Sequence, residues 1–428
     1  MADPSLPLLA SAPPPWISSA STAFRSGRRL PGFLLHGIPN SASTARYAFS
    51  SSTQGPNIYE GTEQAGSRRQ NQFPERLTTT FSFPPLVRIL SILIDAKNGL
   101  NGLANALERP VALWDTQFTG QRPIVGVGHH FVVYASPYND SDKCGKQAAS
   151  GAEVYCIKAP VLANGPTSPE FRSDFYHTVL QELRVLCHPI LSQHENIVSL
   201  LGLDFQEDYD NFEVAWPILL MEYAEYGTLD TFRQDLNLEP VLIRRLLLDI
   251  ALGLKALHDS NIIHGDVKSE NVLICGHARR KYVAKLSDFG FALINPALDE
   301  RHQLPGCTRL WSAPESGNLL AVEGLQRTDV FSFGLIVWRV FLNCADPFLF
   351  LDRESTRVPS HLGHDEFVNR VKANKSFPDL VILSLAQAHD ETYINIVVRA
   401  TLSPEPSERD LARAISELSQ GWEDSYLE

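Results

Sequence analysis

The 428-residue sequence lacks several features that mark special classes of protein. Its six cysteines lie far apart without a Cys-x-x-Cys pair, which argues against a zinc site and against a disulfide-stapled secreted domain. No apolar run approaches the roughly 18 uncharged residues that a membrane span needs. Positive charge is scarce, with 37 Lys and Arg against 49 Asp and Glu, which argues against nucleic-acid binding through phosphate neutralisation. We therefore expect a cytoplasmic protein with no transmembrane segment and no nucleic-acid partner.

The first 85 residues differ in composition from the rest of the chain. They are rich in Ser, Pro, Ala and Gly without a sustained apolar period, which predicts a disordered tail over residues 1–85. The first 59 residues hold a single acid, Asp3, and four arginines, a composition also found in mitochondrial transit peptides. Eight prolines in that stretch would break an amphipathic targeting helix, so a plain tail is favoured and mitochondrial targeting stays the alternative.

In the rest of the chain, a flanking helix and short β-strands are predicted first, and helices are predicted after them. Leucines recur at helical spacing between Leu86 and Leu107, which predicts a helical flanking segment over 86–117. Short runs rich in β-branched and aromatic residues follow and predict a small sheet. These runs are Ile124–Val127, Phe131–Tyr134, Glu153–Ile157 and Ile218–Met221. Helical periodicity dominates after Thr228, most clearly in Val241–His258 and Val330–Leu342.

Two short strings carry the chemistry. Residues 264–271 read His-Gly-Asp-Val-Lys-Ser-Glu-Asn, and residues 287–290 read Ser-Asp-Phe-Gly. Phosphoryl transfer needs a carboxylate that orients the attacking hydroxyl, together with oxygen ligands that hold Mg²⁺ against the ATP phosphates. Asp266 suits the first role, and Asn271 and Asp288 suit the second. Either string alone is weak evidence, but their order and separation make the pair informative.

The two strings resemble the catalytic loop and the metal-binding turn of eukaryotic-type serine/threonine protein kinases. The resemblance implies an α+β, bilobal protein kinase fold over residues 118–422. Its small β-rich N-lobe would cover about 118–222, and its mainly α-helical C-lobe about 226–422. It also implies transfer of the ATP γ-phosphate to Ser and Thr hydroxyls of protein substrates, with Asp266 and Lys268 as catalytic residues and Mg²⁺ held by Asn271 and Asp288.

Further matches extend the resemblance into the expected N-lobe. Residues 154–158, Val-Tyr-Cys-Ile-Lys, resemble the strand-borne lysine motif. Lys158 would contact the α and β phosphates, and Cys156 would replace the usual alanine against adenine. Glu182 would pair with Lys158 from a helix that begins near Ser168-Pro169-Glu170. Glu170 is the competing acid, but it falls in the first turn of that helix rather than in its middle.

The expected nucleotide site also includes a glycine-rich loop and the segment that joins the lobes. Gly126 and Gly128 would let backbone amides approach phosphate, and Val133 would stack on the base. Phe131 replaces the third glycine of the family pattern, so the loop should be stiffer and bulkier at its far end. The other expected nucleotide-binding residues are Met221, Glu222, Ala224 and Leu273.

Later matches concern the peptide-docking side of the C-lobe. Residues 308–315 resemble the end of the activation segment, and residues 404–409 the last family motif. The resemblance implies an ion pair between Glu315 and Arg409. Lys268 and Thr308 favour serine/threonine over tyrosine specificity. Gly265 replaces the arginine that usually grips a phosphorylated activation segment, and residues 291–307 contain no Ser, Thr or Tyr. We therefore expect no activation by phosphorylation between these two positions.

Two alternatives keep the same fold. A pseudokinase would bind ATP or other proteins without transferring phosphate, but such a site has usually lost at least one key residue. All five are present here, namely Lys158, Glu182, Asp266, Asn271 and Asp288. A small-molecule kinase is disfavoured by the complete activation segment, which in the family helps to form a peptide-docking surface.

Overall fold

The computed structural model describes residues 112–113, 123–128, 130–137, 154–161, 169–207, 215–235, 238–342, 346–351, 353–356, 358–359, 361–386 and 392–420. All of them belong to the second of two compact units, Pro74–Glu428. The expected tail over 1–85 and nearly all of the expected helical segment over 86–117 lie outside the described residues. Within that segment, Ala112 and Leu113 are described and form a short strand.

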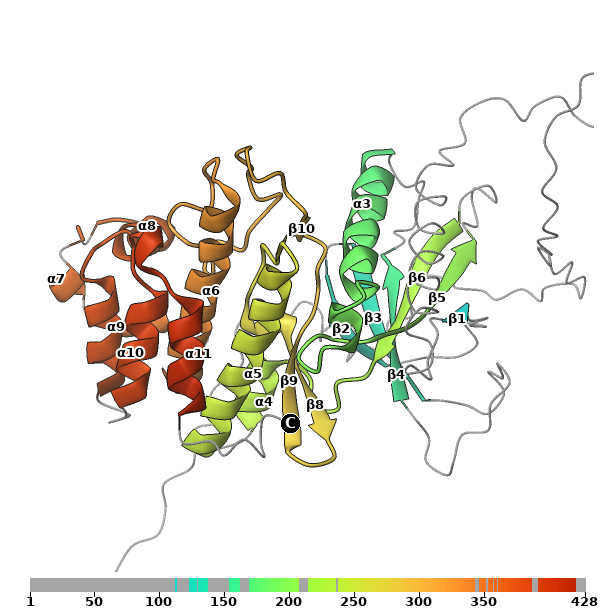
Figure 1. The fold of residues 1–428 in the computed structure, drawn as a ribbon, viewed down its shortest axis with the longest axis horizontal. Coiled ribbons are helices and arrows are strands. Elements are labelled where there is room, and N and C mark those ends of the chain that lie inside the picture. Colours follow the sequence, from blue (N-terminus) through green and yellow to red (C-terminus); the bar gives the residue numbers. More distant parts are fainter. Residues whose placement is uncertain are drawn as a thin grey trace, which may run out of the picture. The chain divides into compact units, whose positions relative to one another are not determined.

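The N-lobe is built on a sheet in which the described residues supply six strands, in the order β1-β5-β6-β4-β3-β2 (Figure 1). The strands are β1 Ala112–Leu113, β2 Ile124–Val127, β3 Phe131–Pro137, β4 Val154–Pro160, β5 Leu200–Glu207 and β6 Ala215–Glu222. β1 runs parallel to β5, and the other neighbours are antiparallel. Four of these strands match the predicted runs. β5 was not predicted, because Gly202 interrupts its apolar pattern where the register with β6 shifts.

One long helix, α3 (Pro169–Leu186), lies alongside this sheet (Figure 1). It begins where the sequence predicted, with Pro169 in the first turn and an acid beside it, and it carries Arg184 in its last turn. Phe175, Val179 and Leu183 repeat every four residues and are completely buried. This apolar stripe turns one face of α3 toward the sheet and thereby aims the residues on that face at the site.

The C-lobe is mainly helical. Its longer helices are α4 Leu229–Asp235, α5 Pro240–Asp259, α6 Val322–Leu342, α8 His364–Lys372, α9 Phe377–Ala386, α10 Thr392–Thr401 and α11 Leu411–Ser419, with the single turn α7 at Arg353–Thr356. Two small antiparallel pairs, β7 (Ile262–Ile263) with β10 (Leu293–Ile294) and β8 (Val272–His277) with β9 (Lys281–Leu286), carry the loops of the site. The observed fold is thus the expected α+β arrangement of a β-rich N-lobe and a helical C-lobe.

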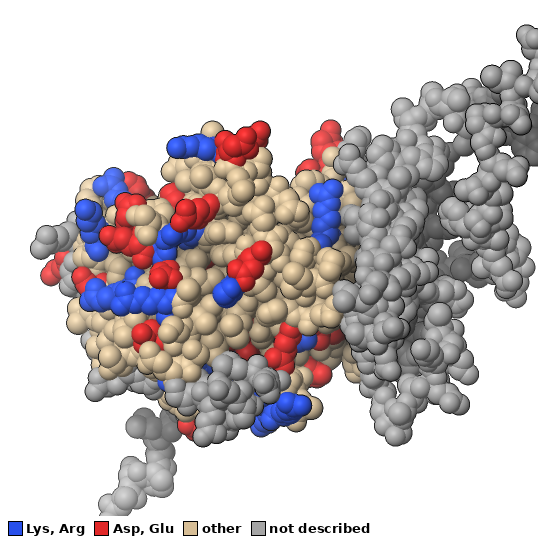
Figure 2. Space-filling view, viewed as in Figure 1, with Lys and Arg blue, Asp and Glu red and all other residues tan. Residues whose placement is uncertain are grey.

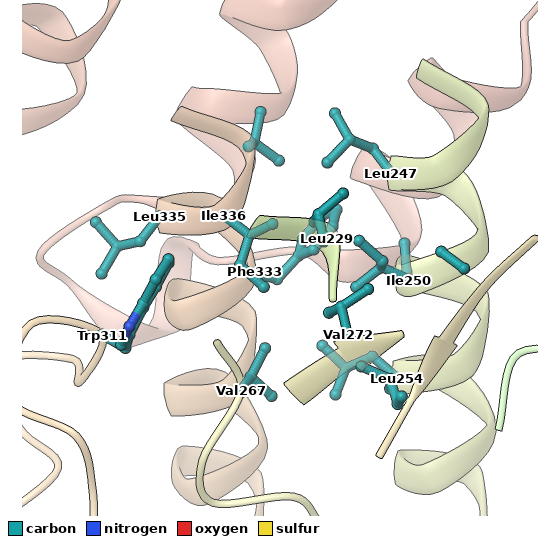
Figure 3. Close-up of a cluster of buried hydrophobic side chains, with 14 of the residues drawn as sticks. Leu229, Leu247, Ile250, Leu254, Val267, Val272, Trp311, Phe333, Leu335 and Ile336 are labelled. Carbon is teal, nitrogen blue, oxygen red and sulfur yellow. The ribbon is translucent and has the colours of Figure 1, made fainter. Parts of the chain in front are cut away.

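The core of the C-lobe lies between α5 and α6. Figure 3 shows Leu247, Ile250 and Leu254 of α5 facing Phe333 and Ile336 of α6. The predicted helix at 330–342 proves to begin two turns earlier, at Val322, because its first turns are more polar but still packed. Every residue of α6 from Thr328 to Phe341 is buried, so this part of the helix forms a rigid base for the catalytic loop.

On the face shown in Figure 2, basic and acidic side chains are interspersed over the described part of the C-lobe, and neither sign forms a large continuous area. None of the helices in the described ranges is both long enough and apolar enough to cross a membrane.

Candidate active site

A buried ion pair forms the N-lobe half of the site. Lys158 lies on β4 between Val133 of β3 and Leu219 of β6. Its Nζ lies 2.8 and 2.7 Å from the two carboxylate oxygens of Glu182, which α3 contributes. It also lies 3.0 Å from Oδ1 of Asp288, just after β9. The pairing of Lys158 with Glu182 that the sequence predicted is therefore present.

Lys158 and Asp288 favour each other's charged form, whereas burial raises the pKa of Glu182 against the attraction of Lys158. Burial alone disfavours the Lys158 ammonium, but the Asp288 and Glu182 carboxylates outweigh it and raise the pKa of Lys158 above its usual value. The Lys158 ammonium in turn lowers the pKa of Asp288 against the effect of burial. Asp288 adopts a left-handed backbone with φ of 62°, which aspartate tolerates better than most residues. At neutral pH the site holds a cationic Lys158 beside an anionic Asp288.

The catalytic-loop half of the site centres on Asp266, whose side chain is almost completely buried. Its Oδ1 accepts a hydrogen bond of 2.7 Å from the Thr308 hydroxyl. Its Oδ2 accepts from the Lys268 ammonium and, at 3.2 Å, from Nδ2 of Asn271. Lys268 also donates to the Thr308 hydroxyl at 3.1 Å. The Lys268 ammonium contributes to the lowered pKa of Asp288, so the two halves of the site lie within electrostatic reach of each other.

The carboxylate of Asp329, on α6, holds the backbone of the catalytic loop in place. Oδ2 of Asp329 accepts from the backbone N–H of His264 at 2.8 Å, and its Oδ1 accepts from that of Gly265 at 3.0 Å. His258 of α5 lies 3.0 Å from the same carboxylate through Nε2. In the sequence, Asp329 begins the string 329–334 that resembles the central helix of the large lobe of the family, but no partner was predicted for its carboxylate. An acidic residue within an apolar helix needs a hydrogen-bond partner. The sequence therefore indicates that Asp329 has a partner, but it does not show which residue that is.

Gly265 occupies a position that no side chain would fit easily. Its φ of 78° lies in the left-handed region, and a Cβ there would stand 2.8 Å from the carbonyl oxygen of Phe291. The same Cβ would touch Leu304 of the activation segment at 3.7 Å. Leu304 is buried in an apolar cluster with Ile263, Val322 and Leu325. The activation segment therefore packs on side chains of the C-lobe where the family pattern places an arginine.

The glycine-rich loop is a tight hairpin between β2 and β3. The N–H of Gly128 donates to the carbonyl of Phe131 at 2.8 Å, and a Cβ on Gly126 would contact Val133 at 3.6 Å. Phe131 does not point away from the protein, as a bulky loop residue would. It is 5% exposed and packs under the sheet against Phe175 of α3.

The expected adenine-binding residues gather where the lobes meet. Cys156 of β4 pairs in register with Met221 of β6. Burial raises the pKa of the Cys156 thiol to about 11, opposed by a backbone hydrogen bond with Ala224, so the thiol stays protonated. Leu273 of β8 packs with Ala224 in a small apolar cluster. The surroundings of these four residues are apolar, which suits a purine ring.

The remaining expected residue of this set, Glu222, directs its side chain away from that apolar surface. Its Oε1 accepts from the N–H of Ser199 at 2.6 Å, and both oxygens accept from Lys285 of β9 at 2.8 Å. Glu222 thus ties β6 to the C-lobe through its side chain, and only its backbone remains for a nucleotide.

The residues present fit a magnesium–nucleotide complex. Asp288 offers a carboxylate whose side chain is 46% exposed. The Nδ2 of Asn271 is engaged by the backbone and side chain of Asp266, so its amide oxygen is the atom suited to a cation. Hard cations such as Mg²⁺ prefer such oxygen ligands, and the Lys158 ammonium provides the complementary charge for phosphate.

Two further buried basic side chains bind residues that follow Thr308. The guanidinium of Arg409 is completely buried and bonds Glu315 with both terminal nitrogens, Nη2 to Oε2 at 3.0 Å, as the sequence predicted. Lys372 at the end of α8 was not predicted. Its Nζ donates to the carbonyls of Arg309, Leu310 and Ser312, each at 2.9 Å. Both residues hold the segment that follows Thr308.

Comparisons with known proteins agree with this geometry. A sequence model of the protein tyrosine and serine/threonine kinase family matches residues 167–387, just over half of the chain. A probable serine/threonine-protein kinase of Dictyostelium discoideum is 29% identical over 240 residues, covering 50% of this chain and 14% of the relative. A probable receptor-like protein kinase of Arabidopsis thaliana is 28% identical, covering 52% and 24% respectively. The tyrosine-protein kinase SYK of Gallus gallus is also 28% identical, covering 45% and 28%. The chain thus spans less than a third of each of these curated relatives.

Proposed function

This chain belongs to the protein tyrosine and serine/threonine kinase family, and on that premise we propose that it transfers the γ-phosphate of ATP to serine and threonine hydroxyls of proteins. One observation carries the proposal. Lys158 bonds Glu182 and Asp288, while Asp266 bonds Lys268, Asn271 and Thr308. This is the set of charges that phosphoryl transfer requires, and it comes from segments that are far apart in the sequence.

In the proposed reaction Asp266 orients the substrate hydroxyl and accepts its proton. The hydroxyl oxygen attacks the γ-phosphorus as the bond from that phosphorus to the β,γ-bridging oxygen breaks, which releases ADP. Lys268, bonded to Asp266, neutralises charge on the transferred phosphoryl group. Because Asp266 is buried and held by three donors, its orientation before transfer is fixed and little reorganisation is needed during the step.

The other residues of the site bind the nucleotide. Lys158, held by Glu182, contacts the α and β phosphates. Asn271 and Asp288 would hold Mg²⁺, which would supply positive charge to neutralise the phosphates. The lowered pKa of Asp288 keeps its carboxylate ionised at neutral pH, as a metal ligand must be.

Lys268 and Thr308 support serine/threonine specificity. Both contact the carboxylate of Asp266, so together they shape the space that the incoming hydroxyl enters. The relatives include both serine/threonine and tyrosine kinases, so the choice rests on these contacts. Phosphoamino-acid analysis of a mixed peptide library should give phosphoserine and phosphothreonine, and phosphotyrosine as the main product would refute the assignment.

A direct test uses the full chain, expressed in bacteria and assayed with ATP and Mg²⁺ for incorporation of labelled phosphate. Asp266→Asn should lower kcat by about 10²- to 10⁴-fold, because orientation and proton acceptance are lost. The same variant should bind nucleotide almost as well as the wild type. Lys158→Met, in contrast, should weaken both nucleotide binding and phosphate transfer. Equal transfer by the wild type and Asp266→Asn would exclude the proposed mechanism. Nucleotide binding without any transfer would favour a pseudokinase.

A further inference from the structure

Phe131 stands where the family pattern has its third glycine, and it is integrated into the N-lobe core. It is 5% exposed, and its ring centroid lies 5.0 Å from that of Phe175 on α3. The Lys158 Nζ lies over the face of the same ring, 4.6 Å from its centroid. The ring therefore touches both the proposed phosphate-binding lysine and the helix that supplies the partner of this lysine.

The helix side of this contact continues as an aromatic cluster. Phe175 packs edge-on against Trp216 of β6 at 5.1 Å, and Tyr176 stacks on the same indole at 6.0 Å. Phe171 lies 5.4 Å from His130, the residue before Phe131. Rings from the end of the glycine-rich loop, from α3 and from β6 thus interlock on the inner face of the sheet. Such aromatic pairs stabilise a structure beyond the apolar area that they bury.

The spacing along α3 connects this cluster to the ion pair. Phe175 and Glu182 are seven residues apart, which is roughly two turns, so both face the sheet. A ring that fixes Phe175 therefore also fixes the rotation of α3 that brings Glu182 to Lys158. The electron-rich face of Phe131 meanwhile attracts the Lys158 ammonium, in addition to the two carboxylates.

Building on the proposed function, we propose that Phe131 is a positioning residue, whose ring holds Lys158 and α3 in the arrangement needed for phosphoryl transfer. The replacement of the third glycine by Phe131 therefore supports activity and does not impair it. Restoring the glycine of the family pattern should damage the enzyme, which is the opposite of what the pattern alone suggests.

The decisive variant is Phe131→Leu, which keeps an apolar side chain and removes the ring face. We expect kcat to fall about 2- to 30-fold, the range of a cation–π contact between exposed and desolvated settings. KM for ATP should change less than kcat, because the adenine contacts at the lobe junction remain while the phosphates lose their aligned ammonium. Phe131→Gly should lower kcat further.

The matched control is Ile218→Ala on β6. Ile218 is equally buried, but it belongs to the cluster with Tyr155 and Ile157, apart from the aromatic one. This variant should lower the melting temperature at least as much as Phe131→Leu and leave kcat near the wild-type value at a temperature where both are folded. If the two variants lose kcat in proportion to their lost stability, or if Phe131→Leu is as active as the wild type, the proposal is overturned.

A second readout does not depend on catalysis. Hydrogen exchange of the α3 amides around Glu182 should be faster in Phe131→Leu than in the wild type, while exchange in α5 stays unchanged. An inert wild-type protein that shows this difference would refute the proposed function and keep the positioning role. Unchanged exchange in α3 would refute the positioning role whatever the activity.

Discussion

The two lobes hold their parts of the site by different means. In the N-lobe, Lys158 is positioned by side chains, namely two carboxylates and the ring of Phe131. In the C-lobe, buried charges bind the backbone itself, as Asp329 does with His264 and Gly265. Side-chain contacts allow one element to shift against another, whereas charged hydrogen bonds to buried backbone fix a loop in one conformation. The comparison predicts that removing a buried charge that binds backbone is seen first in stability, and that removing a side-chain contact of Lys158 is seen first in activity.

The largest expected effect comes from Arg409→Met. The Arg409 guanidinium bonds Glu315 and the carbonyls of Ser403 and Arg327, so its removal leaves a carboxylate and backbone oxygens without their donor. We expect a loss of roughly 3 to 5 kcal/mol in the free energy of unfolding, measured by urea denaturation.

The control for this variant is Arg309→Met. Arg309 pairs with Asp365 at 3.3 Å, but both side chains are mostly exposed. Exposed pairs of this kind contribute at most about 1 kcal/mol. Similar losses for the two variants would contradict the structural role given to the buried pair.

Glu182→Gln tests the N-lobe side of the comparison. The amide can still accept a hydrogen bond from Lys158, but it no longer carries the charge that offsets the ammonium. Hydrogen bonds to charged groups contribute about 1.5 to 3 kcal/mol, so kcat should fall roughly 10- to 100-fold while the unfolding free energy changes less than in Arg409→Met. Glu170→Gln, in the exposed first turn of the same helix, should leave kcat unchanged. An equal fall in the two glutamine variants would point to a general effect of charge on α3.

Lys372→Met adds pH dependence to the comparison. Burial lowers the pKa of Lys372 from 10.5 to about 7, against the attraction of Cys307 and Asp346. Removing the amino group leaves three carbonyls without their donor and should cost about 1 to 3 kcal/mol. Between pH 7 and 10.5 the unfolded chain binds a proton that the folded protein has released. Wild-type stability therefore rises with pH over this range relative to the variant.

Unfolding by urea at about pH 6.5 and 9 measures this dependence, and the deficit of Lys372→Met should be larger at the higher pH. Its matched control is Lys375→Met, three residues further on and exposed, which should show neither the deficit nor the dependence on pH. A deficit that is the same at both pH values would mean that the folded protein keeps the Lys372 proton.

The sequence predicted those parts of the site whose residues are consecutive in the chain. Residues 264–271 and 287–290 indicated the catalytic loop and the metal turn, and the position of Glu182 on α3 followed from the cap of the helix. These elements are local, because each is set by the residue types within one turn or one loop.

The sequence could not show which distant residues support these elements. Asp329 and Lys372 act through backbone atoms of other segments, and a backbone atom leaves no signature in the sequence of its partner. Phe131 was correctly identified as a departure from the family pattern. Whether its ring would point outward or into the core depended on Phe175 and Trp216, which lie on other elements.

The smallest expected effect concerns the activation segment. The segment is held by the burial of Leu304 against Ile263 and by paired backbone hydrogen bonds of 2.8 and 2.9 Å between His302 and Leu320. Gly265 offers no guanidinium to a phosphate, so phosphorylation between 291 and 307 has neither an acceptor residue nor a binding partner at this position. Phosphatase-treated protein from bacteria should therefore retain its kcat within about 2-fold.

Leu304→Gln sharpens this last test, because it places an amide in the apolar cluster and loosens the segment from within. Its kcat should be lower than that of the wild type both before and after phosphatase treatment. If the wild-type protein instead becomes inert on dephosphorylation and recovers when an upstream kinase modifies residues 291–307, the C-lobe depends on an external switch. In that case the contrast between the lobes would not hold for the activation segment, because phosphorylation and not the contacts within the C-lobe would fix its conformation.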